Sequence, residues 1–334
     1  MYMQGGLSRM TSVSVVIPVY RSGSCLEELY RQLMPAMESI CSQFEVIMVE
    51  DHGEDGSWEL IKKLSNRDPR LRGIQLSRNY GQHNALLCGI RSARYDVVVT
   101  MDDDLQNPVS EISVLLDKLA DGYDVVYGAP RQEQHGIFRN IASNITKMTL
   151  QGAMGVESAR NVSAFRAFRT RLRDGFRYYR SPYVSIDVLL TWSTSSFTAV
   201  KVKHEARYAG QSNYSIKKLV SHAFNMMTGF SVFPLQIASM MGFAFTLFGF
   251  GVLAWVLGRY FITGTSIPGF PFLASIIAIF SGAQLFAMGI FGEYLARIHF
   301  RTMDRPPYVT AQSSENNEGI PQQPAADASD ITNG

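Results

Sequence analysis

Two long stretches without charge constrain this chain more than any other feature. Residues 219–258 and 260–292 contain no Asp, Glu, Lys or Arg. Within them, residues 232–257 and 270–291 are each long enough to cross the roughly 30 Å hydrocarbon layer of a bilayer as a helix. A very hydrophobic helical hairpin of a soluble protein is the alternative. The length of both stretches favours a two-helix transmembrane anchor at residues 231–297.

The basic residues around these stretches predict an orientation. They precede the first span and follow the second, and the loop between the spans holds only Arg259. Because cytoplasmic segments carry the excess of Lys and Arg, we expect both ends of the chain in the cytoplasm. Residues 215–230 then form an amphipathic juxtamembrane helix at the interface. Residues 298–334 form a cytosolic tail that is polar and, we expect, disordered from about residue 312.

The first 214 residues have a different pattern and are expected to form a cytosolic domain. Apolar, β-branched runs alternate with segments of helical spacing, which predicts an α/β fold: a doubly wound, Rossmann-like, mainly parallel sheet. The predicted strands are residues 14–19, 44–49, 71–76, 97–100 and 125–129. Residues 138–154 have one apolar helical face, which suits either the core or a membrane surface.

Composition narrows the possible partners and compartment of this domain. With 31 Lys and Arg against 29 Asp and Glu, the net charge of +2 does not indicate a nucleic-acid partner. Three cysteines without metal-ligand spacing are interpreted as reduced thiols of a cytosolic protein. No apolar stretch precedes Val13, so we expect no cleaved secretory signal.

The fourth predicted strand ends in three carboxylates. Residues 97–100 are apolar or β-branched, and Asp102, Asp103 and Asp104 follow almost at once. Open α/β sheets bind ligands at the carboxyl ends of their strands. Asp102, Asp104 and Gln106 alternate in an extended segment, so their oxygens can converge on one Mg²⁺ or Mn²⁺ ion. A solvated acidic turn is the alternative.

Residues at the ends of the first two strands suit a nucleotide. Pro18 and Tyr20 offer a flat apolar wall for a base, and Asp51 can accept a hydrogen bond from a nucleobase imide N–H. An ordinary turn or helix-capping role for Asp51 is the alternative. Arg207 lies in a polar, glycine-containing loop, where it suits either a phosphate or an ordinary surface position. Neither a dinucleotide-binding nor a P-loop glycine motif follows any predicted strand.

These motifs in this order resemble the family 2 polyprenyl-phosphate glycosyltransferases of GT-A fold, and the resemblance covers nearly all of residues 12–310. The segments that carry it are VVIPVY, MVEDHGEDGSW, LSRNYGQHNALLCGI, MDDDLQNP, RYAGQSNYSIKKL and FGEYLARI. The resemblance implies a nucleotide site at Pro18, Tyr20, Asp51 and Asp103 and a metal site at Asp102, Asp104 and Gln106. It also implies phosphate contacts from Arg131 and Arg207, and an acceptor-phosphate site at Arg207, Ser212 and Lys217. The catalytic residues that it implies are Asp102, Asp104, Arg131 and Arg207.

The activity that the resemblance implies is inverting transfer of a sugar from a nucleotide-diphosphate sugar, with UDP favoured over GDP or dTDP, to undecaprenyl phosphate. The product serves cell-envelope glycan synthesis or modification at the bacterial inner membrane. Glycines in both spans make a homo-oligomer plausible. A processive polysaccharide synthase subunit and a non-catalytic membrane scaffold are the alternatives.

Three positions depart from the family pattern. Many members carry an aspartate in a G-D-F-R-like segment, and residues 161–166 read NVSAFR here, without that acid. Asn213 stands where some members have a phosphate-binding lysine, and His52 interrupts the usual glycine-serine after the second strand. These changes leave the fold and the reaction class in place, and they leave the donor sugar open.

Overall fold

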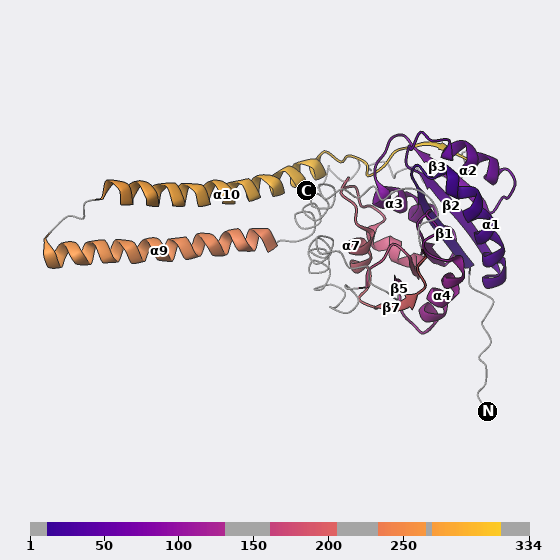
Figure 1. Ribbon diagram of the computed structural model, residues 1–334, viewed down its shortest axis with the longest axis horizontal. Helices are drawn as coiled ribbons and strands as arrows, with labels where there is room; N and C mark the ends of the chain where they lie inside the picture. Colours follow the sequence, from indigo (N-terminus) through magenta and orange to yellow (C-terminus); the bar gives the residue numbers. More distant parts are fainter. Residues whose placement is uncertain (1–11, 131–160, 206–232, 265–268, 315–334) are drawn as a thin grey trace, which may run out of the picture. The chain divides into compact units, whose positions relative to one another are not determined.

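The computed structural model describes residues 12–130, 161–205, 233–264 and 269–314 (Figure 1). Its contacts divide the chain into two units. The first, here called the α/β unit, comprises residues 1–215 together with residues 305–334, and the second, the helical hairpin, comprises residues 216–304. The predicted amphipathic helix at 215–230 and the segment at 138–154 lie outside the described residues.

A single eight-stranded sheet organises the α/β unit in the order β7-β5-β6-β4-β1-β2-β3-β8. The strands are β1 (Ser12–Val19), β2 (Gln43–Glu50), β3 (Leu71–Leu76), β4 (Val97–Thr100), β5 (Val125–Pro130), β6 (Arg166–Arg169), β7 (Phe197–Val202) and β8 (Thr310–Ser313). Strands β1, β2, β3 and β4 run parallel to one another, as do β5 and β7. The predicted α/β class with a mainly parallel sheet is therefore confirmed.

Helices cover both faces of this sheet, which explains why its central strands are buried along almost their whole length. They are α1 (Gly23–Ile40), α2 (Ser57–Ser65), α3 (Gln82–Ser92), α4 (Ile112–Ala120) and α7 (Ile186–Thr191), with short 3₁₀ helices η1 (Val109–Glu111) and η2 (Thr170–Phe176). Apolar side chains of α1, α2 and α4 form one core cluster with β1 and β2. Helix α3 packs on β1 and β2 from the other face, next to Val16 and Val49.

Two antiparallel strands were not predicted from the sequence. Strand β6 lies between β4 and β5 and is antiparallel to both. Strand β8 pairs antiparallel with β3, and the indole N–H of Trp58 donates to the Gln312 side-chain carbonyl at 3.0 Å. Residues 312–314, where the disordered tail was expected to begin, are ordered against β3, and residues 315–334 lie outside the described part of the chain.

The helical hairpin consists of α9 (Phe233–Thr263) and α10 (Phe270–Thr302), which lie side by side (Figure 1). Segments 234–262 and 279–302 are long and apolar enough to cross a membrane, with mean hydropathies of 2.0 and 1.2. The rings of Phe245 and Phe280 meet edge to face, with centroids 5.5 Å apart. The two predicted apolar helices are thus present, and α10 continues several residues past the predicted boundary at 297.

Helix α3 approaches the sheet through Gly89. A Cβ atom at this position would lie 2.3 Å from Cγ1 of Val16 and 3.2 Å from Cγ2 of Val49. We expect Gly89→Ala to destabilise the α/β unit by about 1–3 kcal/mol, because the helix must move off the sheet. Thermal unfolding of the detergent-solubilised protein measures this loss. Gly258→Ala is the matched control, since a Cβ at Gly258 meets nothing within 4 Å. Equal stability of both variants would contradict the expectation.

Candidate functional site

The predicted site residues follow three adjacent parallel strands. In the sheet, β1 lies between β2 and β4, so the chain segments after Val19, Glu50 and Thr100 leave the sheet at the same edge. The backbone N–H of Asp51 donates to the Val19 carbonyl at 2.9 Å. The backbone N–H of Tyr20 donates to the Asp103 carboxylate at 3.3 Å. The structure therefore brings the predicted nucleotide residues and the acidic segment together.

The acidic segment makes a tight, irregular turn. Gln82 Nε2, from the first residue of α3, donates to Asp102 Oδ1 at 2.7 Å. The Gln106 backbone N–H donates to Asp104 Oδ1 at 3.1 Å. Leu105, between them, has a φ of 61°, in the left-handed region that a branched, buried side chain seldom occupies. Backbone strain of this kind concentrates at functional sites, where the surrounding structure maintains it.

Asp103 is the carboxylate of this turn that burial affects most clearly. Burial raises its pKa to about 6, and the neighbouring Asp104 charge adds to the rise. Hydrogen bonds from Ser22 and the Tyr20 backbone act in the opposite direction. The turn therefore holds negative charge in a poorly solvated place, where a positive charge would be stabilising.

The donor set fits a Mg²⁺ or Mn²⁺ ion shared with a phosphate ligand. Among the described residues no group of three His, Cys, Asp or Glu side chains is arranged to hold a metal. Asp102 and Asp104 supply two carboxylates, and Gln106 adds an amide oxygen. Magnesium sites of nucleotide enzymes use one or two carboxylates and complete the coordination with substrate phosphates and water. The residues present match that kind of site rather than an all-protein cage.

Asp51 has a structural role in addition to the predicted one. Its carboxylate is buried and accepts hydrogen bonds from the backbone N–H groups of Tyr80 and Gly81, both at 2.7 Å. Burial raises its pKa, although these two hydrogen bonds act to lower it. Asp51 thus ties the end of β2 to the loop that leads into α3. Its contact with a nucleobase remains a prediction.

Of the other predicted site residues, Pro18 and Tyr20 lie in the described part of the chain and the rest lie outside it. Pro18 is buried within β1, whereas Tyr20 is 40% exposed and has the Arg21 guanidinium 5.3 Å from its ring centroid. An exposed ring at this edge is free to stack on a base. Arg131, Arg207, Ser212 and Lys217 lie outside the described residues.

A buried polar network beside Asp102 was missed from the sequence. Arg166 on β6 pairs with Asp187 on α7, and both side chains are buried. The only local signal was an arginine inside the apolar segment AFRAF. Its acidic partner comes 21 residues later and cannot be recognised from spacing.

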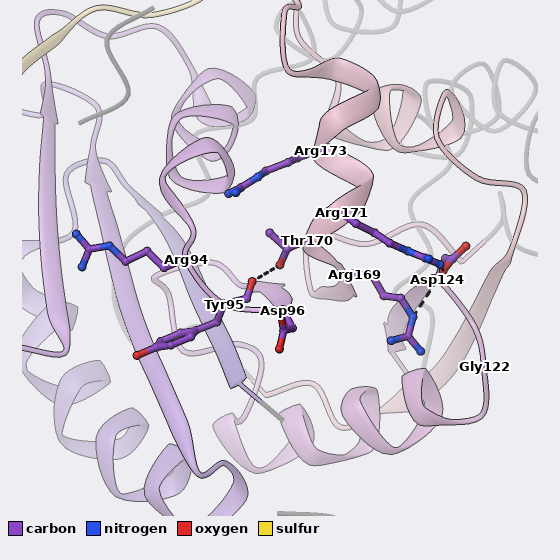
Figure 2. Close-up of a pocket in the computed structure, with 9 residues that line it drawn as sticks. All are labelled: Arg94, Tyr95, Asp96, Gly122, Asp124, Arg169, Thr170, Arg171 and Arg173. Atoms are coloured by element: carbon purple, nitrogen blue, oxygen red, sulfur yellow. Dashed lines mark hydrogen bonds and ion pairs between the residues drawn. The ribbon is translucent and has the colours of Figure 1, made fainter. Parts of the chain in front are cut away.

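A separate cavity of about 540 Å³ opens at the opposite, amino ends of β4 and β5. Its lining includes Asp96, Asp124 and four arginines, two of which point toward the Asp124 carboxylate (Figure 2). Arg171 Nη2 lies 2.9 Å and Arg169 Nε 3.6 Å from Asp124 Oδ1. This cavity contains none of the predicted site residues, and its charges partly neutralise one another.

Comparisons with known proteins identify the family of this chain. Residues 14–179 match the family model described as glycosyl transferase family 2. The chain is 33% identical over 312 residues to undecaprenyl-phosphate 4-deoxy-4-formamido-L-arabinose transferase of Pseudomonas fluorescens (strain SBW25), a match that covers 92% of each protein. It is 32% identical over 316 residues to the transferase of the same name from Yersinia pestis (strain Pestoides F), covering 92% of this chain and 97% of that protein.

Among solved structures, mannosyl-3-phosphoglycerate synthase from Rubrobacter xylanophilus is similar with a TM-score of 0.47 and 15% identity, covering 64% of this chain and 72% of that one. The family match and the observed sheet agree with the predicted GT-A fold. With close relatives matched along almost their whole length, the chain belongs to glycosyl transferase family 2 and is a glycosyltransferase.

Proposed function

We propose that this enzyme transfers a sugar, with inversion, from a nucleotide-diphosphate sugar to undecaprenyl phosphate. The observation that carries the proposal is the meeting of Tyr20 with the acidic turn at the shared edge of β1, β2 and β4. This contact between the segment of an exposed aromatic ring and the acidic turn supports the binding of one nucleotide diphosphate by both. The names of the relatives support undecaprenyl phosphate as the acceptor. We favour a UDP sugar as donor.

In the proposed reaction, Asp102, Asp104 and Gln106 hold Mg²⁺ or Mn²⁺, and Pro18, Tyr20, Asp51 and Asp103 hold the nucleotide. When bound, the metal would neutralise the negative charge that develops on the leaving diphosphate. The acceptor phosphate is already anionic at neutral pH, so its attack needs no strong general base. Arg131 assists the leaving group. Arg207, Ser212 and Lys217 position the acceptor phosphate for in-line attack.

The helical hairpin suits a lipid acceptor. We propose that α9 and α10 anchor the enzyme in the bacterial inner membrane, with the α/β unit and both termini in the cytoplasm. An anchored enzyme and a polyprenyl phosphate share one surface, which raises their effective concentration for each other. Glycines of both helices with open space around them, such as Gly242 and Gly282, allow a second copy to pack closely in a homo-oligomer.

Product formation by detergent-purified protein tests this function. The reaction contains undecaprenyl phosphate, Mg²⁺ or Mn²⁺ and one nucleotide sugar from a panel of UDP, GDP and dTDP sugars. We expect one donor to give a glycolipid of a single added sugar, and EDTA to abolish its formation. A polymeric product would favour a polysaccharide synthase. Nucleotide binding without any glycolipid would contradict the proposed acceptor, and a protein that binds no nucleotide would favour a scaffold.

A further inference from the structure

Three neighbouring strands place three polar residues in one row beside the acidic turn. In the sheet register, Arg166 of β6 stands opposite Thr100 of β4 on one side and Tyr127 of β5 on the other. Directly paired residues of neighbouring strands project to the same face of a sheet. Thr100 is the last residue of β4, and Asp102 follows two residues later. The row therefore ends at the base of the proposed metal site.

The row is joined to α7 by a closed set of hydrogen bonds. Arg166 Nε donates to Thr100 Oγ1 at 3.1 Å, and Arg166 Nη1 donates to Asp187 Oδ1. The Tyr127 hydroxyl donates to the same Asp187 oxygen at 3.0 Å. The Thr100 hydroxyl in turn donates to the Ala164 carbonyl at 2.6 Å. Three strands and one helix are thus tied together through the Arg166 guanidinium and the Asp187 carboxylate.

The stability of the fold does not by itself explain why this charged network is buried. Arg166 is 1% exposed and Asp187 is 8% exposed. A buried ion pair costs several kcal/mol of desolvation per ion, and apolar residues of similar volume are often equally stable in its place. Such pairs are best explained by the arrangement that they specify. Here the arrangement is the position of the carboxyl end of β4 against β6 and α7.

The charge of Arg166 also acts on Asp102. Burial alone would lower the pKa of Arg166, but Asp187, Tyr127 and Asp102 together raise it, so the guanidinium stays charged. Burial and the nearby Asp187 raise the pKa of Tyr127 well above its usual range, so the hydroxyl remains a donor. Asp102 thus accepts a hydrogen bond from the amide of Gln82 and also interacts with the charge of the buried Arg166 guanidinium.

We propose that Arg166, locked by Asp187, Tyr127 and Thr100, is a positioning residue that holds Asp102 in place for the metal and its nucleotide. The inference rests on the proposed function of the acidic turn. It adds a residue that acts through Asp102 and does not itself contact the metal or the nucleotide. Residues that orient metal ligands from behind typically contribute 10–100-fold to metal affinity. The planar guanidinium is required, because a lysine ammonium cannot reach Thr100 and Asp187 with the same fixed geometry.

The test measures binding of Mn²⁺ rather than turnover. Free Mn²⁺ is followed by electron paramagnetic resonance in a titration of the full-length protein, with UDP, GDP or dTDP, whichever the wild type binds most tightly. We expect Arg166→Lys to weaken Mn²⁺ binding in the presence of the nucleotide by about 10–100-fold. Tyr127→Phe leaves the ring and removes one hydrogen bond to Asp187, so we expect a smaller loss of about twofold to fivefold.

Arg72→Lys is the matched control. Arg72 is also buried, at 5% exposure, and Arg72 Nη1 pairs with Glu45 Oε2 at 2.7 Å, but it lies in the first half of β3 and not at the carboxyl edge. We expect this variant to lose thermal stability while its Mn²⁺ affinity stays within twofold of wild type. Equal Mn²⁺ affinity of wild type and Arg166→Lys would overturn the positioning role, as would equal losses in the two lysine variants.

The remaining outcomes are distinguishable from one another. If Arg166→Lys does not fold, Tyr127→Phe decides the matter alone: unchanged Mn²⁺ affinity in that variant contradicts the inference. If the wild type binds no Mn²⁺ with any of the three nucleotides, the proposed function fails and the inference falls with it. A wild type that binds Mn²⁺ and nucleotide while the variants match it overturns the inference and leaves the function intact.

Discussion

Asp104→Asn is expected to lower the turnover of the glycosyltransferase by about 10²–10³-fold, the usual effect of removing one group that stabilises developing charge. Asparagine keeps the shape of the side chain, and its amide oxygen can still accept the Gln106 backbone N–H that Asp104 now accepts at 3.1 Å. What it loses is the negative charge that the metal needs. The loss should diminish at high Mn²⁺ concentration if the substitution weakens metal binding rather than the fold.

Asp121→Asn serves as the control for this measurement. Asp121 follows α4, outside the acidic turn, and accepts a hydrogen bond from Lys118 at the surface. We expect full turnover from this variant and an unchanged melting temperature from both. Undiminished product formation by purified Asp104→Asn protein would show that Asp104 has no catalytic role.

Arg72→Met is expected to destabilise the α/β unit by about 3–5 kcal/mol, because it leaves the Glu45 carboxylate buried without its cation. Glu45 is 4% exposed and accepts hydrogen bonds from the Ser14 hydroxyl and the Arg94 backbone N–H, both at 2.7 Å. Those neutral donors do not replace a guanidinium. Urea denaturation followed by near-UV circular dichroism gives the free energy of unfolding.

The double variant Glu45→Leu/Arg72→Met separates the cost of an orphaned charge from the value of the pair. With both charges removed, the Ser14 hydroxyl and the Arg94 backbone N–H lose their acceptor and the Ser92 carbonyl loses its donor, but no charge stays buried without a partner. We therefore expect much of the stability to return. A double variant as unstable as Arg72→Met would mean that the guanidinium stabilises the sheet by its hydrogen bonds, including that to the Ser92 carbonyl at 3.0 Å.

The parallel strands were predictable because each is a short, buried run with its own local pattern. The apolar run at residues 14–19 predicts a strand, and strand β1 is indeed buried from Val13 to Val19. Strand β6 reads RAFR, with a charge at each end. Its place in the middle of the sheet depends on Thr100, Tyr127 and Asp187, which are distant in sequence. Local periodicity contains no information about such partners.

The same contrast between local patterns and distant partners applies to the residues of the site. The acidic turn was predictable because strand ends and carboxylates are both visible in the sequence. The second role of Asp51 was not, since its hydrogen bonds go to the backbone of Tyr80 and Gly81 and depend on the conformation of a distant loop. Strand β8 reads TAQS, a polar edge segment without apolar alternation, and its pairing with β3 appears only in three dimensions.

The return of the chain to β3 through β8 makes the hairpin an insertion within the catalytic unit rather than an appendage at its end. Ending the chain before α9 would remove β8 and expose the hydrogen-bonding edge of β3 and the side of Trp58 that Gln312 contacts. Unpaired strand edges promote aggregation. A water-soluble catalytic unit should therefore be engineered by replacing residues 216–304 with a flexible linker, which keeps β8 in the sheet.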